Sequence, residues 1–128
     1  MPPVFLELDE VLELHREALE RYGGAPGVRD FGRLEAALAV PRSGAGGAYF
    51  HADLPEMAAA YLFHLVVNHP FVDGNKRVGA LAAFVFLKLN GRTLTAGERA
   101  FEELVRRVAT GRATKADAAA FFRRHAGA

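Results

Sequence analysis

The chain has 128 residues, of which 51% are hydrophobic and 24% are charged, and it contains no cysteine. This composition excludes wholesale disorder, a disulfide framework and a thiolate metal site. Sixteen basic residues against fifteen acidic ones give a formal net charge of +1, so direct binding of nucleic acid is not expected.

No targeting or membrane segment is expected either. The start of the chain turns acidic at Glu7 without the basic region of a signal peptide, and no apolar run approaches the ~20 residues that span a bilayer. We therefore expect a soluble cytoplasmic protein, with residues 1–128 forming one domain.

Two helices and a loop are predicted in the first part of the chain. After an extended lead from Val4 to Leu8, Asp9 is expected to cap a helix that ends at Tyr22, because Gly23-Gly24 follows. Asp30 is expected to cap a second helix ending near Val40. Residues 42–52, "RSGAGGAYFHA", are rich in glycine and predict a loop or flap.

Two buried helices are predicted next, separated by a short polar loop. Asp53 followed by Pro55 and Glu56 is typical of a helix start, and "MAAAYLFHLVVN" is apolar on nearly all sides. A second apolar helix is expected from about Lys76 to Leu89. The fold class predicted is all-α, organised around these two core helices.

Two further helices complete the six that the sequence predicts. Thr95-Ala96-Gly97-Glu98 is interpreted as a capping box for a helix reaching about Ala109. Thr114-Lys115-Ala116-Asp117 has the same pattern and is expected to open the last helix. Five phenylalanines lie at helical spacings, which assigns them to the core: Phe84, Phe86, Phe101, Phe121 and Phe122.

The segment His69–Gly79, "HPFVDGNKRVG", carries the candidate chemistry between the two core helices. Lys76 and Arg77 are predicted in the first turn of a helix, where the positive end of the helix dipole disfavours cations. Two cations and free backbone N–H groups together favour an anion, above all phosphate. Asn75 is expected to be the N-cap, and the flexible Gly74 lets the loop amides turn towards that ligand.

Asp73 and His69 complete this candidate site. A carboxylate would repel bare phosphate, so Asp73 is interpreted as a ligand of Mg²⁺ that bridges phosphate oxygens. A neutral His69 could take the proton of an attacking hydroxyl. Each residue alone is more often a turn, a cap or a solvated side chain, but the whole constellation favours phosphoryl or nucleotidyl transfer.

"HPFVDGNKR" resembles the signature of the Fic/Doc superfamily, His-Pro-Phe-x-Asp/Glu-Gly-Asn-Gly/Lys-Arg, and is most similar to its Doc (death-on-curing) branch. "ERYGGAPGVRDFGRLEAALAVP" also looks like Doc-type sequence. The resemblance implies that His69 is the general base and that Asp73 binds Mg²⁺. It implies that Asn75, Lys76 and Arg77, with the amide of Gly74, hold the phosphates of ATP.

Two departures from the Fic pattern bear on the reaction. Lys76 replaces a small residue, and Ala80 stands where AMP-transferring members carry a second arginine. Doc-type proteins are understood to transfer the γ-phosphate of ATP to a threonine of elongation factor Tu, which arrests translation. The hypothesis is therefore a protein kinase, with AMP or nucleotidyl transfer and a non-catalytic interaction module as alternatives.

The resemblance also implies partners. No Ser/Thr-x-x-x-Glu inhibitory helix is present, so restraint is expected from a Phd-like antitoxin whose disordered tail folds on the toxin. The loop from Arg42 to His51 would be the flap that aligns the target. Tyr49 and Phe50 are candidates for partner contacts or for the core.

The other histidines suggest no metal site. His64 and His69 are five residues apart, which does not place them on one helix face, and His64 is expected to be a satisfied core residue. His15, His51 and His125 show no ligand spacing either.

Overall fold

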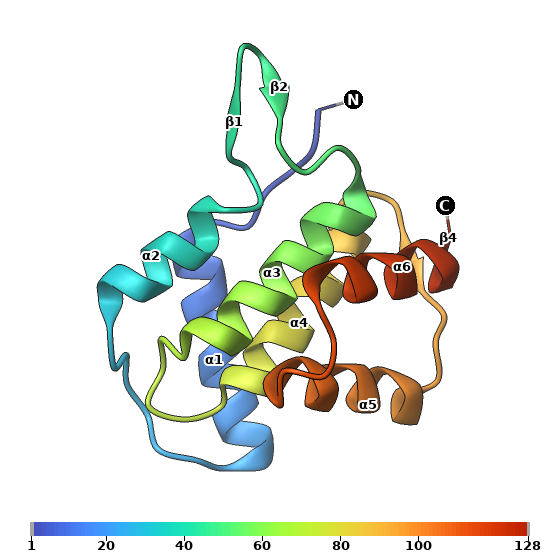
Figure 1. Ribbon diagram of the computed structural model, residues 1–128. Helices are drawn as coiled ribbons and strands as arrows, with labels where there is room; N and C mark the ends of the chain where they lie inside the picture. Colours follow the sequence, from blue (N-terminus) through green and yellow to red (C-terminus); the bar gives the residue numbers. More distant parts are fainter. Residues whose placement is uncertain (1, 128) are drawn as a thin grey trace.

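A computed structural model describes residues 2–127 and confirms an all-α fold. Within that range the chain forms six helices and two pairs of very short antiparallel strands (Figure 1). The elements are α1 (Leu8–Tyr22), α2 (Phe31–Ala39), β1 (Gly44–Ala45), β2 (Ala48–Tyr49), α3 (Leu54–Asn68), α4 (Asn75–Leu89), β3 (Thr93–Leu94), α5 (Glu98–Ala109), α6 (Lys115–His125) and β4 (Ala126–Gly127).

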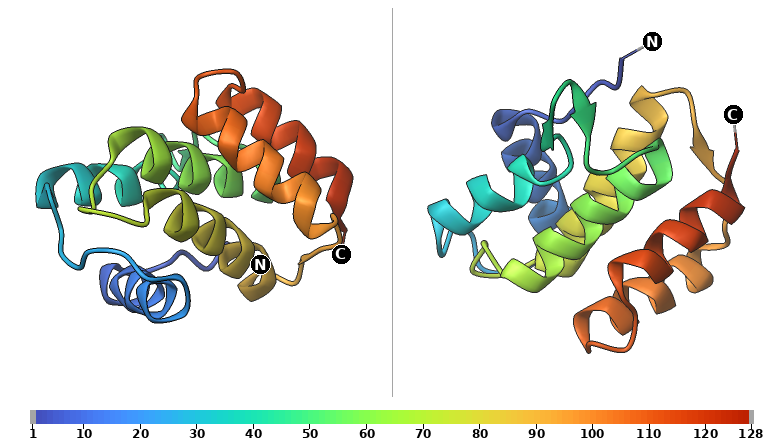
Figure 2. Two further views of the ribbon diagram at one scale, coloured as in Figure 1. Left: turned by 90° about the horizontal axis from the view of Figure 1, so that it is seen from below. Right: turned by 45° about the horizontal axis from the view of Figure 1, so that its top comes forward.

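The two predicted core helices, α3 and α4, lie side by side at the centre of the molecule (Figures 1 and 2). Nine of the fifteen residues of α3 are buried. Small residues let the two helices approach closely: a Cβ built on Gly79 would lie 2.9 Å from Val66 Cγ2 and 3.2 Å from the carbonyl oxygen of Leu62. Gly79 is therefore required for this packing.

The remaining helices cover the central pair. Helix α1 packs on α4, while α2 and α6 pack on α3 from different sides (Figure 2). None of the helices in residues 2–127 is both long and apolar enough to cross a bilayer.

Three predicted helix starts are confirmed in atomic detail. The side chains of Asp30, Asp53 and Thr114 are N-caps, each accepting a hydrogen bond of 3.0 Å from the backbone N–H three residues further on. These caps depend only on neighbouring residues, which is why their local patterns were sufficient to predict them.

Two other predicted starts are wrong. Helix α1 begins at Leu8 with Glu7 as its N-cap, because the backbone N–H of Glu7 donates to Glu10 Oε1 at 2.9 Å. Helix α5 begins at Glu98 with Gly97 as its N-cap. Thr95 instead donates from its hydroxyl and its backbone N–H to the carbonyl oxygen of His125, which fastens β4 beside β3.

The start of α4 differs from the prediction in a way that matters for the site. Gly74, with φ +80° and ψ +14°, is the N-cap, and Asn75 is already the first helical residue. The left-handed conformation suits glycine. The side chain of Asn75 is thereby freed from capping and lies buried, with only 5% of its surface exposed.

The predicted flap contains a small hairpin, β1–β2, with Gly46 and Gly47 at positive φ in its turn. It projects beyond the N-terminal end of α3, whereas His69 follows the C-terminal end (Figure 1). Helix α3 has fifteen residues, so it separates the two by roughly 22 Å. The resemblance implied a flap that aligns the target at the site. The structure instead places the hairpin far from His69.

Candidate active site

The loop between α3 and α4, residues 69–74, is held in place from three directions. On the side of the core, Phe71 is fully buried and stacks on the ring of His15, with ring centroids 3.9 Å apart. On its outer side, residues 27–30 pair with it: Val72 N–H donates to Gly27 O at 3.1 Å. At its end, Asn75 folds its side chain back over it.

His15 is a functional candidate that the sequence did not reveal. It is buried on α1, and its Nε2 lies 2.8 Å from the carbonyl oxygen of Asp73. Because a carbonyl oxygen can only accept, Nε2 donates and fixes the backbone of Asp73. A polar residue on the apolar face of α1 was the only signal available, and it did not identify the partner.

The side chain of Asn75 connects the loop to the candidate base. Its Oδ1 accepts from the backbone N–H of Phe71 at 2.9 Å, and its Nδ2 lies 3.0 Å from the carbonyl oxygen of Phe71. The same Nδ2 lies 3.0 Å from Nδ1 of His69. With its side chain used in this way, Asn75 offers a phosphate only its backbone N–H.

His69 is exposed at the C-cap of α3, in the left-handed conformation with φ and ψ both +52°. Its backbone carbonyl accepts hydrogen bonds from the guanidinium of Arg29, and its ring meets Asn75 on the Nδ1 side. The arrangement leaves the Nε2 side of the ring turned away from these supports.

Asp73 presents an exposed carboxylate at the same loop. Oδ1 accepts from the backbone N–H of Gly74 at 3.0 Å, and Oδ2 accepts from that of Ala25 at 3.2 Å. Gly24 makes room for this contact, since a Cβ there would lie 3.0 Å from Oδ2. Each carboxylate oxygen keeps lone pairs for another ligand.

The carboxylate of Asp73 fits Mg²⁺ better than a metal that needs a protein cage. Within residues 2–127 no three histidine or acidic side chains gather around a common point. Magnesium is commonly held by one or two carboxylates together with water and substrate phosphates. Asp73 matches that pattern as a single protein ligand.

Lys76 and Arg77 are exposed on the first turn of α4, as predicted. No acidic residue lies in that turn to offset them. The guanidinium of Arg77 stacks on the ring of Tyr22 from the end of α1, 3.7 Å from the ring centroid. This contact orients Arg77 before any ligand binds.

The predicted residues converge. A single cleft of about 420 Å³ is lined by His69, Asp73, Gly74, Asn75, Lys76 and Arg77. A histidine, a carboxylate and two cations at a helix N-terminus thus share one solvent-open space. This is the arrangement expected of phosphoryl or nucleotidyl transfer.

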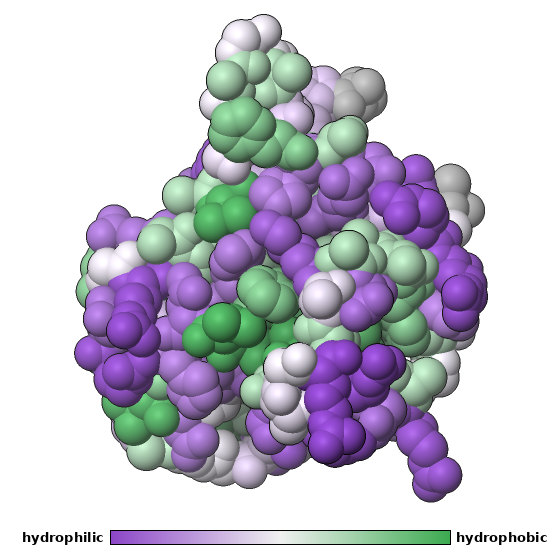
Figure 3. All heavy atoms as spheres, viewed as in Figure 1, coloured by the Kyte–Doolittle hydropathy of each residue, from purple (hydrophilic) through white to green (hydrophobic). Residues whose placement is uncertain are grey.

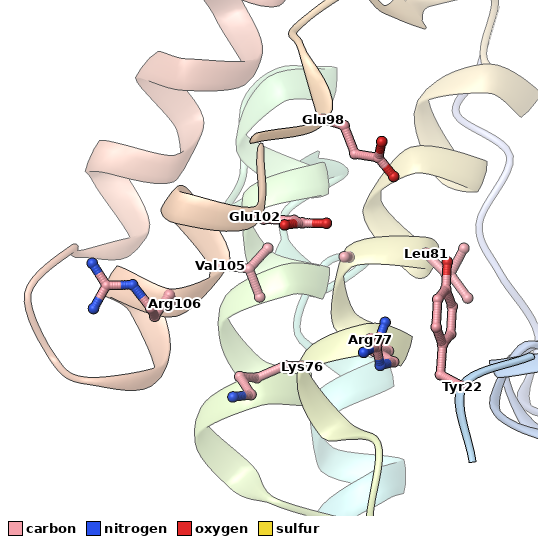
Figure 4. A pocket seen from close by; sticks show the side chains of 9 residues that line it. Tyr22, Lys76, Arg77, Leu81, Glu98, Glu102, Val105 and Arg106 are labelled. Carbon is pink, nitrogen blue, oxygen red and sulfur yellow. The ribbon is translucent and has the colours of Figure 1, made fainter. Parts of the chain in front are cut away.

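A second cavity of about 370 Å³ opens directly beside this cleft, between α4 and α5 (Figure 4). Lys76 and Arg77 form one side of it, and Glu98 and Glu102 extend from α5 on the other. Its floor includes Ala80, Leu81 and Val105. Tyr22 and Arg106 complete the lining, so apolar surface for an organic ligand lies beside several charged groups.

A separate cluster, outside the lining of the cleft, joins His64 of α3 to His51 before α3 and to Lys115 at the start of α6. Lys115 Nζ is 3.1 Å from Nε2 of His64 and 3.1 Å from Nε2 of His51. Burial, reinforced by the charge of Lys115, lowers the pKa of His64 to about 4 and lowers that of His51. His64 is thus hydrogen-bonded, as predicted, but only partly buried.

Comparison with known proteins shows the family to which this chain belongs. The sequence model described as "Fic/DOC family" matches residues 5–87. The chain is 41% identical to Toxin Doc of Mycolicibacterium smegmatis over 109 residues, which cover 83% of this chain and 81% of that protein. It is 42% identical to Protein kinase doc of Escherichia phage P1 over 84 residues, 65% of each chain. The chain therefore belongs to the Fic/DOC family, in its Doc branch.

Proposed function

We propose that this protein is a Doc-type toxin that transfers the γ-phosphate of ATP to a hydroxyl group of a protein. The observation that carries the proposal is the cleft that His69, Asp73, Lys76 and Arg77 line together. A relative that is 42% identical bears the name Protein kinase doc, which supports transfer of phosphate rather than of AMP.

In the proposed reaction, the hydroxyl oxygen of the target attacks the γ-phosphorus, and the bond from that phosphorus to the bridging oxygen breaks. ADP leaves with the electron pair of that bond. Lys76, Arg77 and the first backbone N–H groups of α4 stabilise the charge on the phosphate oxygens. Mg²⁺ held by Asp73 would neutralise part of the charge of the triphosphate.

His69 would accept the proton of the hydroxyl at Nε2. For that step the neutral ring has to carry its own proton on Nδ1. The present contact with Asn75 Nδ2, a donor, opposes that tautomer. We therefore propose that the contact opens during turnover.

The cavity between α4 and α5 is the proposed place for the nucleoside. It adjoins the phosphate cleft at Lys76 and Arg77, so a bound triphosphate can continue into it. Position 80 carries an alanine where AMP-transferring relatives have an arginine. The side chain that it contributes to the floor of the cavity is therefore small and apolar. Glu98 and Glu102 provide acceptors for hydroxyl or amino groups of the nucleoside.

The proposed protein substrate is elongation factor Tu, and the proposed partner is an antitoxin with a disordered tail. Both follow from the resemblance, and the name Toxin Doc of the mycobacterial relative supports the second. Tyr49 in β2 and Phe50 directly after it are 42% and 67% exposed, so they are available for a partner and do not belong to the core. Figure 3 shows hydrophobic surface on the hairpin where it projects from the rest of the molecule.

Incubation of the protein and elongation factor Tu with ATP labelled at the γ- or the α-phosphate tests the reaction. We expect label in the factor only from the γ-position, and a loss of about 10²–10⁴-fold in rate for His69→Ala. Label only from the α-position would establish AMP transfer instead. Equal growth inhibition by wild type and His69→Ala would indicate a binding module.

A further inference from the structure

The backbone of His69 adopts a conformation that its residue type does not favour. It is the only residue other than glycine with positive φ in the part of the chain that the structure describes. The left-handed conformation usually ends a helix at glycine or asparagine, because a Cβ is strained there. Contacts from outside α3 must therefore keep His69 in place.

Arg29 supplies such contacts from a distant part of the sequence. Its Nε and Nη2 donate to the carbonyl oxygen of His69 at 3.0 and 2.6 Å. Its Nη2 also lies 3.5 Å from the carbonyl oxygen of Asn68. Hydrogen bonds from an ionised donor are stronger than neutral ones, and two of them on one carbonyl restrict its direction.

The backbone around Arg29 fixes the next residue of the loop. The N–H groups of Arg29 and Asp30 both donate to the carbonyl oxygen of Pro70, at 2.8 and 3.0 Å. Side chain and backbone thus bind consecutive carbonyls, those of His69 and Pro70. The guanidinium also lies at the negative end of the α3 dipole, which favours its charge.

Arg33 provides a contrast within the same structure. It is also an exposed arginine near the end of α3, and its Nη1 lies 3.4 Å from the carbonyl oxygen of Asn68. No hydrogen bond joins Arg33 to His69, although the structure describes both residues. Arg29 and Arg33 therefore carry the same charge and lie at the same end of α3. They differ in that only Arg29 contacts His69.

We propose that Arg29 is a positioning residue for His69. By holding the carbonyl oxygen of His69, it keeps the residue in the left-handed conformation, with His69 at the cleft that Asp73 also lines. Its effect on turnover rests on the proposed function, whereas its effect on the conformation of His69 does not.

The test compares Arg29→Met, Arg29→Lys and the matched control Arg33→Met. Resonances of the His69 ring are recorded without substrate, using protein labelled with ¹⁵N in histidine, and thermal unfolding is followed in parallel. Kinetics with γ-labelled ATP give kcat and KM for the nucleotide.

Because a small misplacement of a reacting group can cost about 100-fold, we expect Arg29→Met to lower kcat by about 10- to 100-fold. KM should remain within about 2-fold if Arg29 acts through His69 and not on substrate. The His69 ring resonances should shift in Arg29→Met and remain unchanged in Arg33→Met. Arg29→Lys should recover part of kcat, because an ammonium restores charge and one donor.

Unchanged His69 resonances in folded Arg29→Met would overturn the proposal. So would a rise in KM alone, which would make Arg29 a substrate-binding group. If the wild type transfers no phosphate, the kinase proposal fails, and the ring resonances still decide the role of Arg29.

Discussion

The amide nitrogen of Asn75 faces Nδ1 of His69 at 3.0 Å, and Phe71 fixes which end of the amide lies there. Because Asn75 Oδ1 accepts from the N–H of Phe71, the atom facing His69 is the nitrogen, which can only donate. Nδ1 of His69 therefore accepts. The neutral ring is expected to carry its proton on Nε2 in the free protein.

Nitrogen NMR of the histidine rings checks this prediction. We expect Nδ1 of His69 to show the signal of an unprotonated imidazole nitrogen in the wild type. In Asn75→Asp, the carboxylate accepts and should move the proton to Nδ1, at some cost in stability because the carbonyl of Phe71 loses its donor. The same tautomer in both proteins would contradict the orientation of Asn75 described above.

Tyr22 is expected to assist Arg77 without touching a phosphate itself. The stacking of Arg77 on its ring, at 3.7 Å, limits the positions of the guanidinium. An exposed cation–π contact contributes about 0.5–1 kcal/mol. Tyr22→Leu should therefore weaken binding of magnesium-ATP about 2- to 5-fold in calorimetry, and Arg77→Met should weaken it more. Tyr49→Leu, an exposed tyrosine on the hairpin, is the control and should change nothing.

Most residues that line the cleft could be predicted because they lie close together in the sequence. The segment from His69 to Arg77 carries its chemistry within nine positions, and the helix dipole identifies the unusual place of Lys76 and Arg77. The caps at Asp30, Asp53 and Thr114 were predictable for the same reason. In each case the interacting groups are neighbours in the chain.

The supports of the cleft could not be predicted, since they join distant residues. His15 binds the carbonyl of a residue 58 positions away, and Arg29 one 40 positions away. At Thr95 a prediction was made and was wrong: the pattern fits a helix cap, yet the hydroxyl donates to the carbonyl oxygen of His125. A local pattern cannot exclude a tertiary partner that competes for the same group.

Gly79→Ala is predicted to destabilise the fold through the contact between α3 and α4. The added methyl group would lie 2.9 Å from Val66 Cγ2 and 3.2 Å from Leu62 O, and the backbone oxygen cannot turn aside. Overpacking of this kind costs about 1–3 kcal/mol. Denaturant unfolding measures the change.

Gly32→Ala is the control for that experiment. Its new Cβ would have one ordinary contact, with Asp30 Oδ1 at 3.5 Å, at the start of α2. Alanine favours a helix over glycine by about 0.5–1 kcal/mol, so this variant should be as stable as the wild type or more so. Equal losses in both variants would refute the packing argument.

The cluster of His51, His64 and Lys115 predicts a stability that depends on pH. Burial and the Lys115 charge lower the pKa of His64 from 6.5 to about 4. Glu56 is the acidic group that acts on His51, whose pKa it raises against the effects of burial and Lys115. Between the two pKa values of His64 the unfolded chain binds a proton that the folded chain does not. The free energy of unfolding should therefore fall as the pH falls from 6.5 towards 4.

His64→Gln removes that titration and keeps a polar side chain beside Lys115. Its unfolding free energy should decline less than that of the wild type over this pH range. His125→Gln, on α6 outside the cluster, should follow the wild type. Denaturant titrations at several pH values measure the unfolding free energy of each protein. If it depends on pH in the same way in wild type and His64→Gln, the prediction is contradicted.

Filling the cavity between α4 and α5 should weaken binding of the nucleoside without weakening binding of the phosphates. Ala80 is half-buried in the cavity floor, so Ala80→Phe would occupy space proposed for the nucleoside and leave Lys76 and Arg77 in place. Inorganic tripolyphosphate with Mg²⁺ reports the phosphate cleft alone, and ATP with Mg²⁺ reports both parts. We expect Ala80→Phe to weaken ATP binding at least about 10-fold, the loss of about 1.4 kcal/mol of contacts. It should leave tripolyphosphate binding within about 2-fold.

Ala36→Phe, on the exposed side of α2, controls for a new aromatic ring. Equal weakening of both ligands would show that the ring disturbs the phosphate cleft, and unchanged ATP binding would place the nucleoside outside this cavity.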